Sequence, residues 1–463
     1  MKSLSENLYF KSPIFIQNIG LSIYGWRLNR ERYGGRYPAF FDEVARRSKC
    51  AREEIDDHVD ALVSQTVRHA TEDVPYYRRL FRRLGLAAQD IQSASDLHQL
   101  PLLGKSSIRR DPTQFVSDRY DLRKLQRIHT TGTTGTPLVI YCNETTRQAN
   151  YAFYDHFLGE NDIRYRGKRA TFGGRIIVPP GQTAPPFWRY SRFQKNLLFS
   201  SYHLMEKNIP RYIDKLHTFQ PDLIDAYPSS LYSIADFARR HDIELKGVAS
   251  AITTSAETLF SEQLKVIEET FGVPVYDQYG AAEMCVFVGQ CQKGAYHIRT
   301  DYALVEVLGP DGSPAPPGES GELVCTGFIN PVMPLIRYRI GDRGGLSKNA
   351  CPCGSPFPVL ENLIGRQDDV LLTPDGRRVG RLSPVLKGFP VREVQYVQDS
   401  IEEVKVFIVR DAGYSEETDK EVISELRKRL GSHIALHLKF VEAIHRGPGG
   451  KFKSILSRLE NES

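Results

Sequence analysis

The sequence contains no run of about 18 apolar residues, which argues against a membrane-spanning helix. It also shows no secretory signal, because Met1–Lys11 is polar and has no apolar h-region. The stretch ENLYF at Glu6–Phe10 resembles part of a protease-tag site, although Lys11 stands where such a tag carries Gln. Whether this stretch is native or a tag is therefore left open.

A large excess of one charge sign is missing as well. The net charge is +5 over 463 residues, which is weak support for a nucleic-acid partner. Two basic clusters with interleaved aromatics, Arg27–Tyr37 and Arg78–Gly85, are interpreted as solvated helix faces. The length favours two or three domains. With 41% hydrophobic and 25% charged residues, the composition is that of an ordinary soluble globular protein.

The even set of cysteines that is typical of a disulfide scaffold is absent too. The chain has seven cysteines, and an odd number in so long a chain fits a reducing compartment better. We therefore expect a cytoplasmic protein. The seven are Cys50, Cys142, Cys285, Cys291, Cys325, Cys351 and Cys353.

The pattern of apolar residues changes along the chain. Residues 40–90 show helical spacing of their apolar positions. After Leu100, β-rich runs alternate with amphipathic helices, which favours βαβ units and a mainly parallel sheet. From about Tyr302 the pattern is β, and Asp369–Ser463 reads as a small α+β domain with a hairpin around Asp375–Gly376.

These patterns predict an α/β fold. A large N-terminal domain is expected to contain mainly parallel sheets and a β-rich subdomain, followed by a small α+β C-terminal domain. The predicted segments are 1–100, the helical part of the large domain; 101–368, its core with the β-rich subdomain; and 369–463, the small domain.

The most unusual local stretch is TTGTTGTP at Thr130–Pro137. It is not a Walker A loop, because no Gly-Lys-Ser/Thr follows. Its two glycines allow close backbone approach, its N–H groups can form an anion nest, and its threonines add hydroxyl donors. By itself the stretch predicts a phosphate-binding loop and a simple threonine-rich turn equally well.

Four further motifs carry chemically suitable side chains. VYDQYGAAEM offers an aromatic for a base in Tyr279 and a carboxylate for Mg²⁺ in Glu283. PLIRYRIGD ends in Asp342, which can accept two ribose hydroxyls. LIGRQDD contains Arg366, and the glycine-rich RGPGGKFK presents Lys451. Each has an ordinary structural explanation, but the order and spacing of all five motifs favour one common site.

Together these motifs resemble the adenylate-forming enzymes, the acyl-CoA synthetase and luciferase-like superfamily. Within it the chain most resembles phenylacetate–CoA ligases, and especially their relatives encoded in capsular-polysaccharide clusters. The resemblance covers nearly the whole chain. It also includes the stretches VPYYRRLF, RATFGGRIIVPP, FSSYHL, DAYPSSLY, MPLIRYRIGD and CPCGSPFPVLENLIGRQDD.

The resemblance implies a nucleotide site for ATP. The threonine-rich loop would hold the pyrophosphate end, Ala256–Glu257 and Tyr279–Gly280 the adenine, Asp342 the ribose, and Arg366 the ribose or a phosphate. The implied nucleotide-binding residues are Thr130, Thr131, Gly132, Thr133, Thr134, Gly135, Ala256, Glu257, Tyr279, Gly280, Asp342 and Arg366.

It also implies a catalytic set. Lys451 would bridge the substrate carboxylate and the α-phosphate, Glu283 would bind Mg²⁺, and Thr134 would act from the phosphate loop. Asp368 would be the hinge about which the small, mobile domain rotates between two reaction steps. These roles fit a reaction in which two anions must meet and their repulsion must be offset.

The implied function is ATP-dependent activation of a carboxylic acid as acyl-AMP, followed by transfer to an acceptor, with CoA favoured. The likeness to polysaccharide-cluster relatives and the polar hairpin TPDGRRVG, which departs from the family pattern, keep an amine or hydroxyl acceptor open. A second departure, Leu138 in place of a common Lys, costs the phosphate loop one charge. A nucleotide-binding scaffold of low activity is the alternative from another class. The expected partners are small molecules and, as an alternative to a monomer, a second copy in a homodimer.

A separate group of residues has metal-ligating chemistry. Cys291 and His297 lie before the β-rich segment, and Cys351 and Cys353 lie after it. Folding of that segment can bring them together into a closed Cys₃His set, which predicts a structural Zn²⁺ site. Cys285 is the reserve ligand, and reduced buried thiols are the alternative. The other three cysteines are interpreted as packing residues.

The residues of the acid-binding pocket are harder to assign from the sequence. Several aromatic stretches suit a flat or aryl acid, and packing explains each of them equally well. The candidate pocket residues are Gly173, Arg175, His203 and Tyr227.

Overall fold

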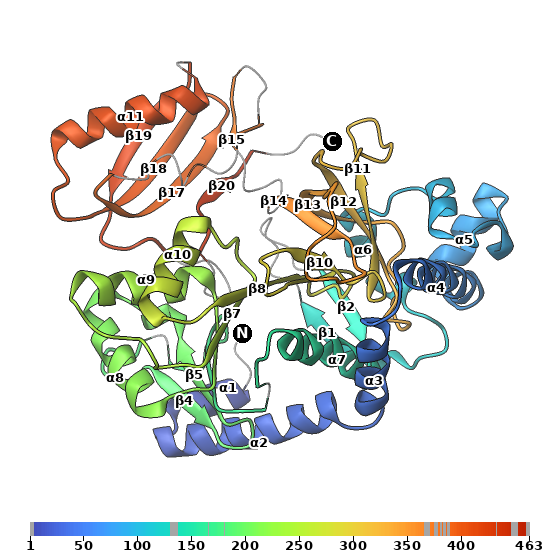
Figure 1. The fold of residues 1–463 in the computed structure, drawn as a ribbon, viewed down its shortest axis with the longest axis horizontal. Helices are drawn as coiled ribbons and strands as arrows, with labels where there is room; N and C mark the ends of the chain where they lie inside the picture. Colours follow the sequence, from blue (N-terminus) through green and yellow to red (C-terminus); the bar gives the residue numbers. More distant parts are fainter. Residues whose placement is uncertain are drawn as a thin grey trace. The chain divides into compact units, whose positions relative to one another are not determined.

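The computed structural model describes residues 4–129, 138–164, 166–179, 181–364, 371–374, 378–379, 382, 386, 389–431, 433–445 and 452–459. The chain divides into two compact units, Met1–Leu363 and Ile364–Ser463. The first of these, unit 1, contains the large sheet and most of the helices (Figure 1). The predicted boundary at 368/369 lies outside the described ranges and stays a prediction.

The large sheet of unit 1 has its strands in the order β11-β12-β13-β14-β10-β9-β8-β7-β6-β3-β5-β4. The run β5-β3-β6-β7-β8 is parallel, and the remaining neighbours whose register is described are antiparallel. The strands are β3 (Arg169–Gly173), β4 (Trp188–Ser191), β5 (Asn196–Ser200), β6 (Leu223–Ala226), β7 (Ala251–Ser255), β8 (Val275–Gly280), β9 (Phe287–Gln290), β10 (Tyr296–Ile298), β11 (Ala303–Leu308), β12 (Gly321–Gly327), β13 (Tyr338–Leu346) and β14 (Val359–Ile364).

The parallel strands are joined by helices because parallel neighbours need crossover connections. Apolar residues such as Ala170, Ile224 and Ile252 stand side by side on β3, β6 and β7 and are buried. They pack with helix residues such as Ile234 and Ile267 in one core cluster. The helices of this region are α7 (Glu144–Glu160), α8 (Ile209–Phe219), α9 (Pro228–Arg240) and α10 (Ser261–Phe271).

The N-terminal region is helical, as the spacing predicted. In α4 the residues Ile55, Val59, Val63 and Val67 form its buried face. Pro75 starts the next helix, where a proline costs no hydrogen bond. The helices are α1 (Leu4–Lys11), α2 (Ile14–Tyr33), α3 (Tyr37–Arg47), α4 (Arg52–Asp73), α5 (Pro75–Leu84) and α6 (Lys105–Arg110), with 3₁₀ turns at 88–90, 94–99, 112–115 and 122–124. Within the described part of the chain, no helix is both long and apolar enough to cross a bilayer.

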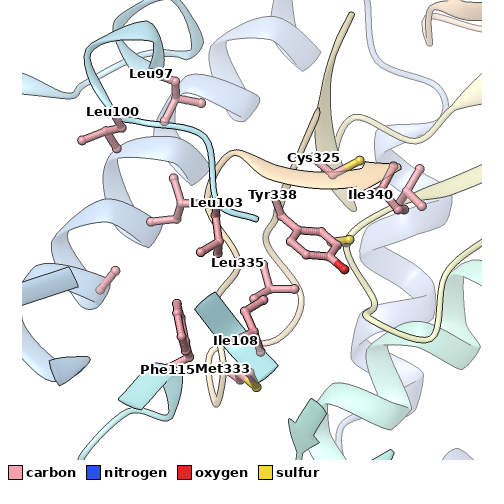
Figure 2. Packing of buried hydrophobic residues seen from close by; sticks show 14 of the residues in the cluster. Leu97, Leu100, Leu103, Ile108, Phe115, Cys325, Met333, Leu335, Tyr338 and Ile340 are labelled. Carbon is pink, nitrogen blue, oxygen red and sulfur yellow. The ribbon is translucent and has the colours of Figure 1, made fainter. Parts of the chain in front are cut away.

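One core cluster joins this helical region to the antiparallel strands. Figure 2 shows part of it, where Leu103 and Phe115 from the N-terminal region lie near Leu335 and Tyr338. A hairpin of β1 (Gln126–His129) and β2 (Val139–Cys142) contributes further residues to the same cluster. The β-rich segment is therefore packed into unit 1 rather than standing alone.

The second unit is a small α+β structure. Its main sheet has the order β19-β18-β17-β20, and α11 packs apolar residues such as Val422 and Leu426 into the same cluster as Val406. The predicted hairpin strands pair, with Leu371 opposite Val379, while its turn at 375–377 is outside the described residues. The elements are β15 (Leu371–Leu372), β16 (Arg378–Val379), β17 (Val391–Ser400), β18 (Glu403–Arg410), α11 (Glu416–Leu430), β19 (Ala435–Phe440) and β20 (Ile455–Ser457). The predicted fold class is confirmed.

Candidate active site

Three neighbouring parallel strands end at the candidate nucleotide site. Tyr227 directly follows β6, Ala256 and Glu257 directly follow β7, and Tyr279–Gly280 closes β8. The register aligns these ends, since Ala226 pairs with Thr254 and Ser255 with Gln278. In open α/β sheets ligands bind outside the carboxyl ends of the strands. The topology thus brings together residues that are far apart in the sequence.

The backbone at Ala256 is held in an unfavourable conformation. Its φ is +70°, in the left-handed region that a residue with a Cβ atom rarely adopts. Such a conformation costs about 1–3 kcal/mol and persists only where the surroundings enforce it. The next residue, Glu257, accepts a hydrogen bond of 3.0 Å from the backbone N–H of Ser229, near the start of α9. This contact ties the loop after β7 to the neighbouring helix.

Tyr279 and Asp342 form a partly buried pair across the sheet. The Tyr279 hydroxyl donates to Asp342 Oδ2 over 2.6 Å. Burial and the nearby Asp342 carboxylate raise the pKa of Tyr279 well above its usual value, so the phenol stays neutral and keeps donating. Asp342 comes from β13, in the antiparallel part of the sheet. The pair therefore links the predicted adenine and ribose residues directly.

Glu283 lies in the turn after β8 and is 4% exposed. The Tyr338 hydroxyl donates to Glu283 Oε1 over 3.0 Å. Tyr338 itself is fully buried and lies beside Cys325 and Ile340 in Figure 2. A carboxylate has two oxygens and about four acceptor positions, so one bond from a phenol orients it without using up its capacity for a cation.

Lys105 is a further charged residue of this region that the sequence analysis did not identify. It stands at the start of α6, and its Nζ donates to the carbonyl of Ile340 over 2.7 Å, two residues before Asp342. Its charge also opposes the effect of burial on the pKa of Cys285, which burial raises. A positive charge at this position favours an anion nearby. Nothing in the local sequence separates Lys105 from the other lysines, and only the fold identifies it.

Several predicted residues lie outside the described part of the chain. These are Thr130, Thr131, Gly132, Thr133, Thr134, Gly135, Arg366, Asp368 and Lys451. The residues that flank the threonine-rich loop are described, with His129 opposite Val139 in the β1–β2 pair. Leu138, which replaces a common lysine, is 1% exposed and belongs to the main core cluster. A charged side chain would be costly at such a buried position.

The four candidate pocket residues do not share one environment. Gly173 ends β3, His203 follows β5, and Tyr227 follows β6, so these three lie at aligned ends of neighbouring strands. His203 is buried, with its Nδ1 2.8 Å from Ser200 Oγ and its ring stacked on Phe187. The Arg175 guanidinium lies over the Tyr24 ring of α2 at 5.5 Å from its centroid, so it contacts a different element.

The four predicted zinc ligands are brought together. Their ligand atoms all lie within 4.8 Å of one another. The sulfurs of Cys291 and Cys351 are 3.8 Å apart, and Cys353 Sγ is 3.2 Å from His297 Nε2. Two thiolates of a tetrahedral site with zinc–sulfur bonds of ~2.3 Å lie about 3.8 Å apart, whereas a disulfide needs ~2.05 Å. The spacing therefore fits a zinc tetrahedron and excludes a disulfide between Cys291 and Cys351.

The surroundings of the cluster fit the same interpretation. His297 Nδ1 is 3.0 Å from the carbonyl of Phe357, which fixes Nε2 as the nitrogen that faces the sulfurs. Both cysteine turns end in a glycine with φ near +80°, Gly294 and Gly354, each bonded back to the first cysteine of its turn. Cys285, the reserve ligand, is not part of the group and is buried in the main core cluster instead.

Comparisons with known proteins agree with this architecture. A family model described as the CapK C-terminal domain matches residues 371–458. The chain is 29% identical to Protein CapK of Staphylococcus aureus, over 98% of this chain and 99% of that protein. It is 26% identical to a phenylacetate-coenzyme A ligase of Thermus thermophilus, over 85% of this chain and 87% of that protein.

Solved structures extend the likeness to the fold. The crystal structure of a 2-hydroxyisobutyryl-CoA ligase in complex with R3-HIB-AMP has a TM-score of 0.70 to this chain. Its sequence identity is 20%, and the match covers 90% of this chain and 92% of that one. The predicted resemblance to adenylate-forming enzymes of the phenylacetate–CoA ligase-like branch is confirmed by these relatives.

Proposed function

We propose that this relative of CapK and phenylacetate–CoA ligases is an AMP-forming acid ligase. The observation that carries the proposal is the convergence of Ala256, Glu257 and Tyr279 at the ends of β7 and β8, with Asp342 bonded to Tyr279. A base, a ribose and a phosphate chain need an apolar wall, a carboxylate acceptor and positive charge, and this edge of the sheet has all three types of group.

The proposed reaction has two steps. First, a substrate carboxylate oxygen attacks the α-phosphorus of ATP, the bond to pyrophosphate breaks, and acyl-AMP forms. Then an acceptor attacks the acyl carbon, and AMP leaves. Activation is needed because the oxide of a free carboxylate is a poor leaving group. In the first step the repulsion between two anions must be offset, which is the electrostatic part of catalysis.

Each described residue has a defined part in this proposal. Asp342 accepts hydrogen bonds from the ribose hydroxyls, and Tyr279 both orients that carboxylate and flanks the base. Glu283 has the hard oxygen ligands that Mg²⁺ prefers, and it is the residue that would hold the ion. When bound, Mg²⁺ would neutralise charge on the phosphates. Lys105 adds fixed positive charge beside β13.

The remaining roles concern residues outside the described ranges and rest on the resemblance. The loop at 130–137 is proposed to bind the phosphates, Arg366 the ribose or a phosphate, and Lys451 the developing charge on the α-phosphate. Asp368 is proposed as the hinge for the small domain. An aryl acid is proposed as substrate and CoA as acceptor, since several relatives are named phenylacetate-coenzyme A ligases.

The experiment for this proposal is a direct search for the intermediate. Purified protein is incubated with ATP, Mg²⁺ and a panel of aryl and aliphatic acids, and acyl-AMP is sought by mass spectrometry. CoA, amines and alcohols are then added separately. Consumption of acyl-AMP by CoA supports thioester formation, whereas consumption by an amine or alcohol favours an amide or ester ligase.

The contact between Tyr338 and Glu283 gives a prediction for the metal dependence. Tyr338→Phe removes the hydroxyl that orients Glu283, so the Mg²⁺ concentration for half-maximal activity should rise roughly fivefold, equivalent to about 1 kcal/mol. The measurement is a Mg²⁺ titration of pyrophosphate release. Tyr77→Phe is the matched control, because its hydroxyl is also buried but bonds the backbone at Pro334 and Ile336. An equal shift in both variants would contradict the assigned role of Glu283.

We also propose that the cysteine–histidine cluster binds a structural Zn²⁺. The set is closed, with four protein ligands, so its effect is on stability rather than on the reaction. The protein should contain one zinc per chain, with zinc–sulfur distances near ~2.3 Å by X-ray absorption. Loss of a residue that only holds a metal ligand in place typically weakens metal binding by about 10- to 100-fold. Cys351→Ser removes a ligand itself, so it should weaken zinc binding by more than that and lower the thermal midpoint.

The control for the zinc prediction is Cys50→Ser, a thiol outside the cluster. This variant should keep both its zinc and its thermal midpoint. Far less than one zinc per chain, in protein prepared with zinc and without chelator, would leave the four residues as reduced thiols and an imidazole.

A further inference from the structure

Helix α2 exposes a row of large apolar side chains to solvent. Its outward face carries Phe15, Ile19, Ile23 and Trp26, which are 65%, 54%, 59% and 50% exposed. The face toward the protein carries the buried residues Gln17, Gly25 and Leu28. It also carries the polar side chains of Asn18 and Ser22. A surface helix normally turns its apolar side to the core. We call the outward residues Phe15, Ile19, Ile23 and Trp26 the α2 face.

The inward polar residues have a structural purpose. Strand β4 is the edge of the large sheet, and α2 lies along it (Figure 1). Asn18 Oδ1 accepts from the backbone N–H of Tyr190 over 3.0 Å, and Ser22 Oγ accepts from that of Arg192 over 3.0 Å. The side chains of α2 thus satisfy an edge strand that would otherwise expose unpaired backbone groups.

This packing fixes the rotation of the helix. A Cβ atom at Gly25 would clash with Ser191 Oγ and crowd the Gln194 side chain, so a larger residue here would force the contact between α2 and β4 to shift. Leu28 is buried on the same side. Rolling the helix to bury the α2 face would break the bonds to β4 and bring bulky side chains to Gly25's position. The contacts with β4 therefore keep these apolar residues on the outer side of the helix.

The α2 face is continuous and is followed by positive charge. Its residues stand at i, i+4, i+8 and i+11, which places them in one stripe about 17 Å long. Arg27 and Arg30, both exposed, follow it at the C-terminal end of the helix. The first 37 residues contain six basic and two acidic side chains, so this region carries most of the net charge of +5.

We propose that the α2 face binds an anionic membrane surface, with α2 lying in the plane of the headgroups. A helix with Trp, Phe and Ile on one side and arginines at its border has the composition of interfacial helices, and anionic lipids complement the arginines. A second copy of the chain is the other occupant to consider: a parallel symmetric pairing would bring Arg27 and Arg30 of both copies together, whereas an antiparallel pairing would leave these arginines without the anionic partner that a lipid surface supplies. The inference goes beyond the ligase function and is independent of it.

The first experiment is sedimentation of the full chain with vesicles of phosphatidylcholine, with or without phosphatidylglycerol. Wild type should sediment with the phosphatidylglycerol vesicles. Ile19→Ser/Ile23→Ser should lose at least about tenfold in binding, because two aliphatic side chains no longer enter the lipid. The matched control is Leu84→Ser/Leu122→Ser, which removes two exposed apolar residues from other elements and should bind like wild type.

A second measurement reports the contact itself. The chain has two tryptophans, so Trp188→Phe leaves Trp26 as the only tryptophan, which can be excited selectively over the tyrosines. Its fluorescence should shift to shorter wavelength with phosphatidylglycerol vesicles. Absence of both binding and shift would overturn the proposal, and equal binding to phosphatidylcholine alone would overturn its anionic part. A wild-type dimer that Ile19→Ser/Ile23→Ser converts to a monomer, without vesicle binding, would identify a second copy as the occupant.

Ile19→Ser/Ile23→Ser and its control Leu84→Ser/Leu122→Ser should both retain acyl-AMP formation in solution, since none of the substituted residues belongs to the proposed nucleotide site. Normal acyl-AMP formation without vesicle binding would therefore reject the membrane inference alone. Vesicle binding without acyl-AMP formation by wild type would reject the ligase proposal alone.

Discussion

Lys451→Ala should reduce acyl-AMP formation by about 10²- to 10³-fold or more, while ATP still binds. The reason is that a cation placed against the α-phosphate is used where negative charge develops, in the transition state. Removing a contact made only there lowers the rate of the chemical step and leaves ground-state binding largely intact. Single-turnover formation of acyl-AMP and equilibrium binding of ATP measure the two quantities separately.

Lys439→Ala is the matched control for this prediction. It removes an exposed lysine of β19, in the same unit of the chain, and should change neither rate nor binding. Acyl-AMP formation by Lys451→Ala at nearly the wild-type rate would show that this lysine has no part in the first step. The second step should be less affected, because the proposed rotation of the small domain moves Lys451 away before transfer.

Asp342→Ala should raise the ATP concentration for half-maximal rate by roughly 10- to 100-fold, without unfolding the protein. A carboxylate that accepts two ribose hydroxyls makes charge-assisted bonds, each worth about 1.5–3 kcal/mol. In the variant, water can accept hydrogen bonds from the ribose hydroxyls, so the loss of binding free energy is smaller than the sum of the two bonds. The measurement is the dependence of pyrophosphate release on ATP concentration, alongside the thermal midpoint.

Tyr279→Phe tests the contribution of Tyr279 separately from that of Asp342. It keeps the Asp342 carboxylate and removes only the 2.6 Å bond that orients it, so its effect on the ATP requirement should be several-fold smaller than that of Asp342→Ala. An unchanged ATP requirement in Asp342→Ala would remove this residue from the nucleotide site. A collapse of the thermal midpoint would instead assign it a structural role.

The regular parts of the fold follow from local patterns. The spacing of Ile55, Val59, Val63 and Val67 predicts the buried face of α4, and the alternation of strands and helices after Leu100 predicts the parallel half of the sheet. These patterns are local, because an amphipathic element shows its buried face in its own sequence. The continuity of the parallel and antiparallel strands in one sheet depends on long-range pairing, and no short stretch reveals it.

In the candidate site, too, some residues are predictable from the sequence and others only from the fold. Cys291, His297, Cys351 and Cys353 are predictable as a group because few other residue types bind zinc and their two pairs flank one segment. Lys105 is not predictable, because its proximity to Asp342 arises from the packing of α6 against β13. The outward position of the apolar residues of α2 is not predictable for a related reason, since the sequence does not show which side of the helix contacts β4.

Acid-dependent release of pyrophosphate from ATP distinguishes an acid ligase from a nucleotide-binding scaffold. The purified protein is supplied with ATP, Mg²⁺ and one carboxylic acid at a time, without any acceptor. At least one acid of the panel, with aryl acids favoured, should produce pyrophosphate above the acid-free rate, and Lys451→Ala should abolish this increase. Tight binding of AMP without pyrophosphate release in the presence of any acid would contradict the ligase function and favour a nucleotide-binding scaffold.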